Sequence, residues 1–255
     1  MPAEPGLSVA DRLFRVLESC ASTAGSLTLA DLVERTGLPK TTLHRTCWKL
    51  VELGMLEAGP EGFRVGTKVF ALGCMNPELR RLRVYGMPYM HELVCVTGRV
   101  ANLAVLSGRS ALLVDEVFGA IAPTMPKMMG ARMPLHATAI GKALLLGRSD
   151  EFLDDVIGTA TLKPFTQHTL VRQTLFREHL DRAAEARVAF SRHEWRLGTS
   201  GVAAPVVVDG DTVAAIALIG LSSDADMAAS ARPLSIAAER LGEVLADKPT
   251  HIVNA

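Results

Sequence analysis

The spacing of apolar residues changes near residue 75, and this change constrains the fold more than any other feature. Before it, apolar residues recur at helical spacing in short segments separated by tight turns. After about residue 99, the apolar stretches VAAPVVV at 202–208 and VAAIALIGL at 213–221 indicate buried strands, since a membrane helix needs about 20 apolar residues. The sequence therefore predicts a soluble protein with a helical front part and a larger part built on a sheet.

Three helices and a hairpin are predicted in the front part. Ser8 can cap the first helix, Thr28 precedes a second helix over 29–36, and a third helix runs over 40–53. Gly37-Leu38-Pro39 separates the last two, because Gly ends a helix and Pro favours the first turn of the next. The segment MLEAGPEGFRVG alternates around Gly-Pro-Glu-Gly, which is typical of a two-stranded hairpin. The inner face of the first helix is expected to consist of Val9, Leu13, Val16 and Leu17.

This order of elements is the layout of a winged helix-turn-helix, and the third helix has an outer face suited to DNA. Its apolar stripe leaves cations and threonine hydroxyls outward, with no acidic residue before Glu52. Hydroxyls and lysines suit phosphates, and arginine suits base edges in the major groove. The predicted DNA-binding residues are Lys40, Thr41, Thr42, His44, Arg45 and Lys49, with Arg64 from the hairpin.

Another interpretation of the front part stays open. Similar spacing occurs in purely structural bundles, where cations only form a solvated face. Residues 1–75 hold eight Lys+Arg and eight Asp+Glu, so DNA binding would depend on a local patch. Trp48 also lies outward in the helical arrangement, and we expect it to pack against a following helix or a partner subunit.

The rest of the chain is predicted to be an antiparallel sheet with flanking helices. Residues 68–98 read as helical, interrupted at Asn76-Pro77, the candidate domain boundary, and at Gly86-Met87-Pro88. Tight turns join apolar stretches of strand type, which favours an α+β fold. The strands are expected near 100–106, 111–118, 188–195, 201–208 and 212–221, and the helices near 136–147, 150–157, 171–187 and 226–246.

Composition excludes several classes of protein. The 27 Lys+Arg balance 27 Asp+Glu, so the chain is not a globally basic nucleic-acid binder. The cysteines, Cys20, Cys47, Cys74 and Cys95, lie far apart and are interpreted as small buried residues in a reducing cytosol. Charges throughout the first twenty residues argue against a signal peptide, so a cytoplasmic location is expected.

Three ordered segments carry a resemblance to a known family. They are residues 27–45, ending in GLPKTTLHR, residues 134–145, PLHATAIGKALL, and Gly198 followed by VAAPV at 202–206. Over essentially its whole length the sequence resembles the IclR family of bacterial transcriptional regulators. The resemblance implies a winged DNA-binding domain over 1–75, a linker helix over 76–98, and an effector-binding domain over 99–255 with a GAF-like antiparallel sheet.

The same resemblance implies a ligand-responsive regulator that controls a metabolic operon, here expected to be a repressor. Such regulators form homodimers, often paired into tetramers, on inverted-repeat operators. Dimerisation through the winged and linker segments would place the half-sites about one helical turn apart, roughly 34 Å.

The resemblance also places an effector pocket between the helix near 136–147 and the strands facing it. Of the six matched positions, only Ser191 carries a hydroxyl, and burying a carboxylate without partners costs several kcal/mol. We therefore expect an apolar or aromatic effector, with one polar handle met by Ser191, His193 or a helix amide. The methionines of the preceding loop would add adaptable surface, unless they only fill the core. The predicted effector-binding residues are Met125, Met128, Leu135, Ala139, Ile140, Gly141, Ser191, Gly201, Ala217 and Ile219.

Other constellations favour neither an enzyme nor a metal site. His136 and Lys142 are two turns apart and could serve acid–base chemistry, but we expect His136 to hydrogen-bond within the domain and Lys142 to face solvent or a neighbour. His91 and Cys95 are four residues apart, so a helix could present both to one metal ion, but no second pair of ligand residues follows at a suitable spacing. His168 and His179 are expected at the surface, and no cofactor motif is present.

One alternative from another class remains. The back part could be a small-molecule-binding or enzymatic domain whose front helices serve only protein contacts. Loss of DNA binding, or binding that does not depend on salt, would favour it.

Overall fold

The computed structural model describes residues 7–23, 25–119, 127–158, 162–221 and 224–247. The chain divides into a front unit, Met1–Pro77, and a back unit, Glu78–Ala255. Each unit has its own buried apolar core.

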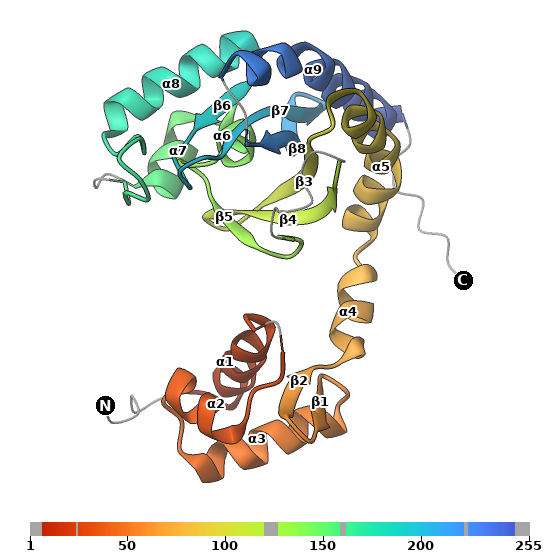
Figure 1. Cartoon of the computed structure of the whole chain (residues 1–255), viewed down its shortest axis with the longest axis vertical. Coiled ribbons are helices and arrows are strands. Elements are labelled where there is room, and N and C mark those ends of the chain that lie inside the picture. Colours follow the sequence, from red (N-terminus) through yellow and green to blue (C-terminus); the bar gives the residue numbers. More distant parts are fainter. Residues whose placement is uncertain (1–6, 24, 120–126, 159–161, 222–223, 248–255) are drawn as a thin grey trace. The chain divides into compact units, whose positions relative to one another are not determined.

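The front unit has the predicted order of helices and hairpin (Figure 1). Ser8 and Thr28 each cap a helix in a capping box with the aspartate three residues on, and Gly37 ends the second helix with φ 68°. The elements are α1 (Val9–Ala21), α2 (Leu29–Thr36), α3 (Lys40–Glu52), β1 (Leu56–Gly59), β2 (Gly62–Val65) and α4 (Thr67–Cys74). The winged helix-turn-helix prediction is confirmed.

The core of the front unit lies between α1, α2, α3 and the hairpin. Leu32, Leu43 and Cys47 are fully buried in it, as the spacing predicts. The expectation for Val9 is wrong, because this first residue of α1 is 65% exposed, beyond the core. Leu27 exchanges backbone hydrogen bonds with Phe63, which ties the segment before α2 to β2.

The back unit is built on one antiparallel sheet of six strands in the order β5-β4-β3-β8-β7-β6. The strands are β3 (Val100–Ser107), β4 (Ser110–Val117), β5 (Arg132–Pro134), β6 (Ala189–Arg192), β7 (Ser200–Val208) and β8 (Asp211–Gly220). The α+β class with an antiparallel sheet is confirmed. Strand β5 was not expected from the Met- and Pro-rich sequence, and only its pairing with β4 makes it a strand.

Helices cover both faces of this sheet (Figure 1). One apolar cluster joins the sheet to α5 and α9, and the other joins it to α6, α7 and α8. The helices are α5 (Pro77–Thr97), α6 (Ala139–Leu145), α7 (Asp150–Ile157), α8 (Gln173–Ala186) and α9 (Asp224–Asp247). Helix α6 starts later than expected because Thr138 caps it by accepting from the Gly141 N–H.

Helix α5 corrects two expectations. The predicted break at Gly86-Met87-Pro88 is absent, because apolar side chains on both sides of Pro88, Leu82 and Met90 among them, are buried in the same cluster. Gly86 permits this packing, since a Cβ there would lie 3.1 Å from a Leu103 methyl carbon. Cys95 of this helix is exposed, contrary to the prediction of four buried cysteines, and Cys74 is half-buried.

No helix in the described ranges is long and apolar enough to cross a membrane.

Candidate DNA-binding surface and ligand cavity

Helix α3 exposes most of the residues predicted to bind DNA. Lys40, Thr41, His44, Arg45 and Lys49 are exposed, and Thr42 is half-buried. No side chain caps its N-terminus, and its first turn holds no acidic residue. Both features favour an anion at this end of the helix.

Two of the predicted cations already have carboxylate partners. Lys49 lies 2.9 Å from Glu52 on the same helix, and Arg64 lies 2.8 Å from Glu57 across the hairpin. Within the described residues, Lys40 and Arg45 form no ion pair. Lys40 and Arg45 are therefore available to an external anion without first breaking a pair.

Trp48 packs within the front unit. Its Nε1 donates to Nε2 of His44 at 3.1 Å, and its ring meets Phe63 of β2 edge-on, with centroids 6.0 Å apart. The contact fixes His44 with Nε2 as the acceptor, so its Nδ1 carries the proton. The tryptophan thus joins α3 to its own hairpin, a contact within the front unit that the sequence did not indicate.

A cavity of about 170 Å³ lies on the α6 face of the back sheet. Its walls come from the start of α6, from all six strands of the sheet, and from the loop that follows β6. Six predicted effector-binding residues line it: Met128, Ala139, Ile140, Ser191, Gly201 and Ile219.

The other four predicted residues do not line this cavity in the described structure. Leu135 and Ala217 are buried in the adjoining core, 5% and 0% exposed. Gly141 lies against the segment before α6, where a Cβ would come 2.5 Å from the Leu135 Cα. Met125 falls outside the described residues.

Polar side chains that the sequence did not identify also line the cavity. The carboxylate of Glu116 accepts the Met128 N–H at 2.9 and 3.0 Å, and the Arg196 guanidinium lies 4.2 Å from the Trp195 ring centroid. Asn102 contributes a buried amide from β3. Alternation along β3 could have indicated Asn102, but nothing local indicates the loop residues.

Of the two surroundings expected for Lys142, solvent or a neighbour, the structure shows a neighbour. This residue of α6 is completely buried, and its Nζ donates to both carboxylate oxygens of Glu194 and to the Phe190 carbonyl. Burial lowers the pKa of the Lys142 ammonium, and the Glu194 carboxylate opposes this shift.

His179 lies against the same ammonium, with Nε2 3.3 Å from Nζ of Lys142, and so does not lie free at the surface as expected. Burial, followed by the Lys142 charge, lowers the pKa of His179 to about 4. His136 behaves as predicted, since its Nε2 hydrogen-bonds to the Lys163 backbone oxygen at 2.9 Å. Among the described residues, no group of three His, Cys, Asp or Glu side chains could hold a metal ion.

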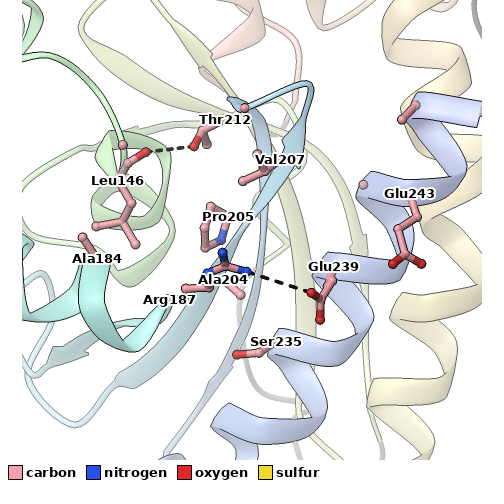
Figure 2. A pocket seen from close by; sticks show the side chains of 14 residues that line it. Leu146, Ala184, Arg187, Ala204, Pro205, Val207, Thr212, Ser235, Glu239 and Glu243 are labelled. Carbon is pink, nitrogen blue, oxygen red and sulfur yellow. Dashed lines mark hydrogen bonds and ion pairs between the residues drawn. The ribbon is translucent and has the colours of Figure 1, made fainter.

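A second, larger cavity of about 480 Å³ lies between β7 and α9 (Figure 2). Figure 2 shows Arg187 reaching toward Glu239, 3.9 Å apart, and both side chains are mostly exposed. None of the predicted effector-binding residues lines this cavity.

Comparison with known proteins adds relatives of both units. Residues 80–236 match the family described as bacterial transcriptional regulator IclR C-terminal, and residues 9–60 match the IclR helix-turn-helix domain. The HTH-type transcriptional repressor AllR of Escherichia coli K12 is 28% identical over 224 residues, which are 87% of this chain and 83% of that protein. AllR of Salmonella typhi is also 28% identical, over 87% of this chain and 82% of its own.

Solved structures share the fold. An IclR homolog from Microbacterium hydrocarbonoxydans, complexed with 4-hydroxybenzoate, has a TM-score of 0.81 at 24% identity, covering 93% of this chain and 100% of its own. The Thermotoga maritima IclR has a TM-score of 0.75 at 20% identity, covering 93% and 98%. Because the C-terminal family match alone spans most of the chain, this protein belongs to the IclR family of bacterial transcriptional regulators.

Proposed function

We propose that this chain represses transcription of a metabolic operon, and that a small apolar or aromatic ligand in the α6 cavity changes its affinity for DNA. The cavity supports this most directly, because it is lined chiefly by apolar side chains and backbone and lies in the domain that follows the helix-turn-helix in the sequence. The names of the curated relatives, each an HTH-type transcriptional repressor, support the sign of regulation.

In this proposal α3 enters the major groove. Arg45 reads a base edge, Thr41 and Thr42 position the helix, and Lys40 contacts a phosphate beside the uncapped helix start. His44 offers its Nδ1 proton to the same surface. Lys49 and Arg64 contribute once DNA phosphates compete with Glu52 and Glu57 for them.

A second copy of the chain is the proposed partner of the front unit. Helix α4 has no buried residue, and Phe70, Leu72 and Met75 in and beside it are 65%, 49% and 75% exposed. Apolar side chains gathered on a short helix favour burial against another protein surface. A homodimer would bring two α3 helices to an inverted repeat with half-sites roughly 34 Å apart.

The size of the α6 cavity supports a ligand of one ring. An engineered apolar cavity of about 150 Å³ binds benzene, and this cavity measures about 170 Å³. The structurally similar Microbacterium protein is complexed with 4-hydroxybenzoate, a compound of that size.

Fluorescence anisotropy tests the proposal. The full chain is titrated against labelled DNA from upstream of its own gene and against a scrambled duplex, over a salt series. Preference for the native duplex by about 10³-fold or more, reduced by a one-ring ligand, is the expected result. No binding at low salt by folded protein would contradict the proposal.

A further inference from the structure

Trp48 lies one turn after His44 on α3 and holds its imidazole ring in place. Side chains of a helix lean toward its N-terminus, so Trp48 lies back over the turn that carries His44. Its Nε1 donates to Nε2 of His44 at 3.1 Å, and the two ring centroids lie 6.3 Å apart. The orientation of the histidine ring is therefore fixed by a neighbour on its own helix.

The core of the front unit anchors Trp48 in turn. Its ring meets the ring of Phe63 edge-on, with centroids 6.0 Å apart, and Phe63 is buried. Phe63 also exchanges two backbone hydrogen bonds of 2.8 Å with Leu27. Trp48 therefore rests on a fixed residue of β2 on one side and supports His44 at the exposed face of α3 on the other.

The contact decides what His44 can offer to a ligand. An indole N–H only donates, so Nε2 of His44 is the acceptor and Nδ1 carries the proton. His44 is exposed between Thr41 and Arg45, and no group in the described part of the chain accepts its Nδ1 proton. Because Nε2 is occupied, His44 presents a hydrogen-bond donor and no free acceptor at this face.

We propose that His44 determines specificity by donating from Nδ1 to an acceptor on a base edge, and that Trp48 is the positioning residue that keeps His44 a donor. This inference rests on the proposed placement of α3 in the major groove. Guanine presents two acceptors there, N7 and O6, whereas cytosine presents an amino group that donates. A side chain that can only donate therefore favours guanine and disfavours cytosine at the base it contacts.

The first test measures base preference. The full wild-type chain selects a duplex from a randomised pool, and anisotropy gives its affinity for that duplex and for each single base-pair variant. We expect one position in each half-site where guanine is preferred over cytosine by about three- to tenfold, the effect of one hydrogen bond. His44→Ala and Trp48→Phe should both lose this preference and keep the preferences at the other positions. Trp48→Phe retains an aromatic ring beside Phe63, so a purely structural Trp48 would leave the preference intact or lower affinity at every position.

The second test observes the tautomer without DNA. The full chain is labelled with ¹⁵N-histidine and studied by NMR at about pH 8, where an imidazole is neutral. The His44→Ala spectrum identifies the signals of His44. We expect a protonated Nδ1 and an unprotonated Nε2 in the wild type, and a protonated Nε2 in a measurable share of Trp48→Phe molecules, because nothing then holds Nε2 as an acceptor.

The outcomes separate this inference from the proposed function. A selected duplex whose base preferences are all unchanged in His44→Ala overturns the inference and leaves α3 as the reading helix. An equal loss of affinity on the selected and a scrambled duplex also overturns it, because His44 would then contact a phosphate. A proton on Nε2 in the wild type overturns the role of Trp48. If the folded wild-type chain selects no duplex, the proposed function fails together with the inference. Circular dichroism checks folding, and His44→Ala, a change at an exposed position, carries the test if Trp48→Phe does not fold.

Discussion

Nζ of Lys142 lies 2.7 Å from Oε1 and 2.8 Å from Oε2 of Glu194, and both side chains are almost completely buried. Lys142 belongs to α6, whose first turn lines the ligand cavity, and Glu194 lies in the loop after β6 that contributes Trp195 and Arg196 to it. The ion pair therefore joins two walls of the cavity.

Replacing Lys142 with Met should strongly destabilise the back unit. The substitution leaves the Glu194 carboxylate buried without its main partner, which costs about 3–5 kcal/mol. The double variant Lys142→Met/Glu194→Leu should recover most of the loss, because well-packed apolar residues often replace a buried pair without penalty. Urea unfolding followed by Trp195 fluorescence, in a Trp48→Phe background, measures both.

The Lys49–Glu52 pair supplies the matched control, since both of its side chains are more than half exposed. Lys49→Met should change stability by less than about 1 kcal/mol. If Lys142→Met lowered the free energy of unfolding as little as this control, the buried ion pair would not stabilise the contact between the two walls of the cavity.

Acid should destabilise the back unit through His179. Its pKa is lowered to about 4 in the folded chain by burial and by Lys142, while an unfolded histidine titrates near 6.5. Between these values the unfolded chain binds the extra proton, so the free energy of unfolding falls as pH falls from about 6.5 to about 4. Urea titrations across this range should show a shallower pH slope in His179→Gln, and an identical slope would contradict the assignment.

Local signals in the sequence predicted the front unit well. Ser8, Thr28 and Gly37 act through their own neighbours in the chain, so helix limits and the hairpin could be recognised without tertiary contacts. Lys142 shows the opposite case. Nothing near it in sequence reveals that its partner lies 52 residues away, so the sequence left open whether this lysine faces solvent or a neighbour.

The cavity was predicted only in part for the same reason. The predicted residues on α6 and on the paired strands come from the family resemblance, and most of them line the cavity. Asn102 lines the cavity because of the order of the strands in the sheet. Trp195 lines it because the loop after β6 turns at His193, where φ is 57°. The pairing of β3 with β8 is long-range and could not be derived from spacing.

Freeing Arg64 should strengthen DNA binding. Glu57→Gln removes the carboxylate that lies 2.8 Å from the Arg64 guanidinium on the hairpin. If Arg64 then contacts a phosphate, the affinity for DNA rises, and the slope of log affinity against log salt concentration becomes steeper by about one. Anisotropy over a salt series measures this. Glu61→Gln at the tip of the same hairpin changes the net charge equally. If it raised the affinity for DNA as much as Glu57→Gln does, the change in net charge alone would explain the effect.

The measurement that tests the central claim most directly is operator affinity of Arg45→Ala, by fluorescence anisotropy against the native upstream duplex and a scrambled one. Arg172→Ala, an exposed cation of the back unit, is the charge-matched control. If Arg45 reads a base from α3, its loss costs about 1–3 kcal/mol on the native duplex and narrows the preference over the scrambled one, while Arg172→Ala changes little. Unchanged affinity in Arg45→Ala, or an equal loss in Arg172→Ala, would contradict the assignment of α3 as the reading helix.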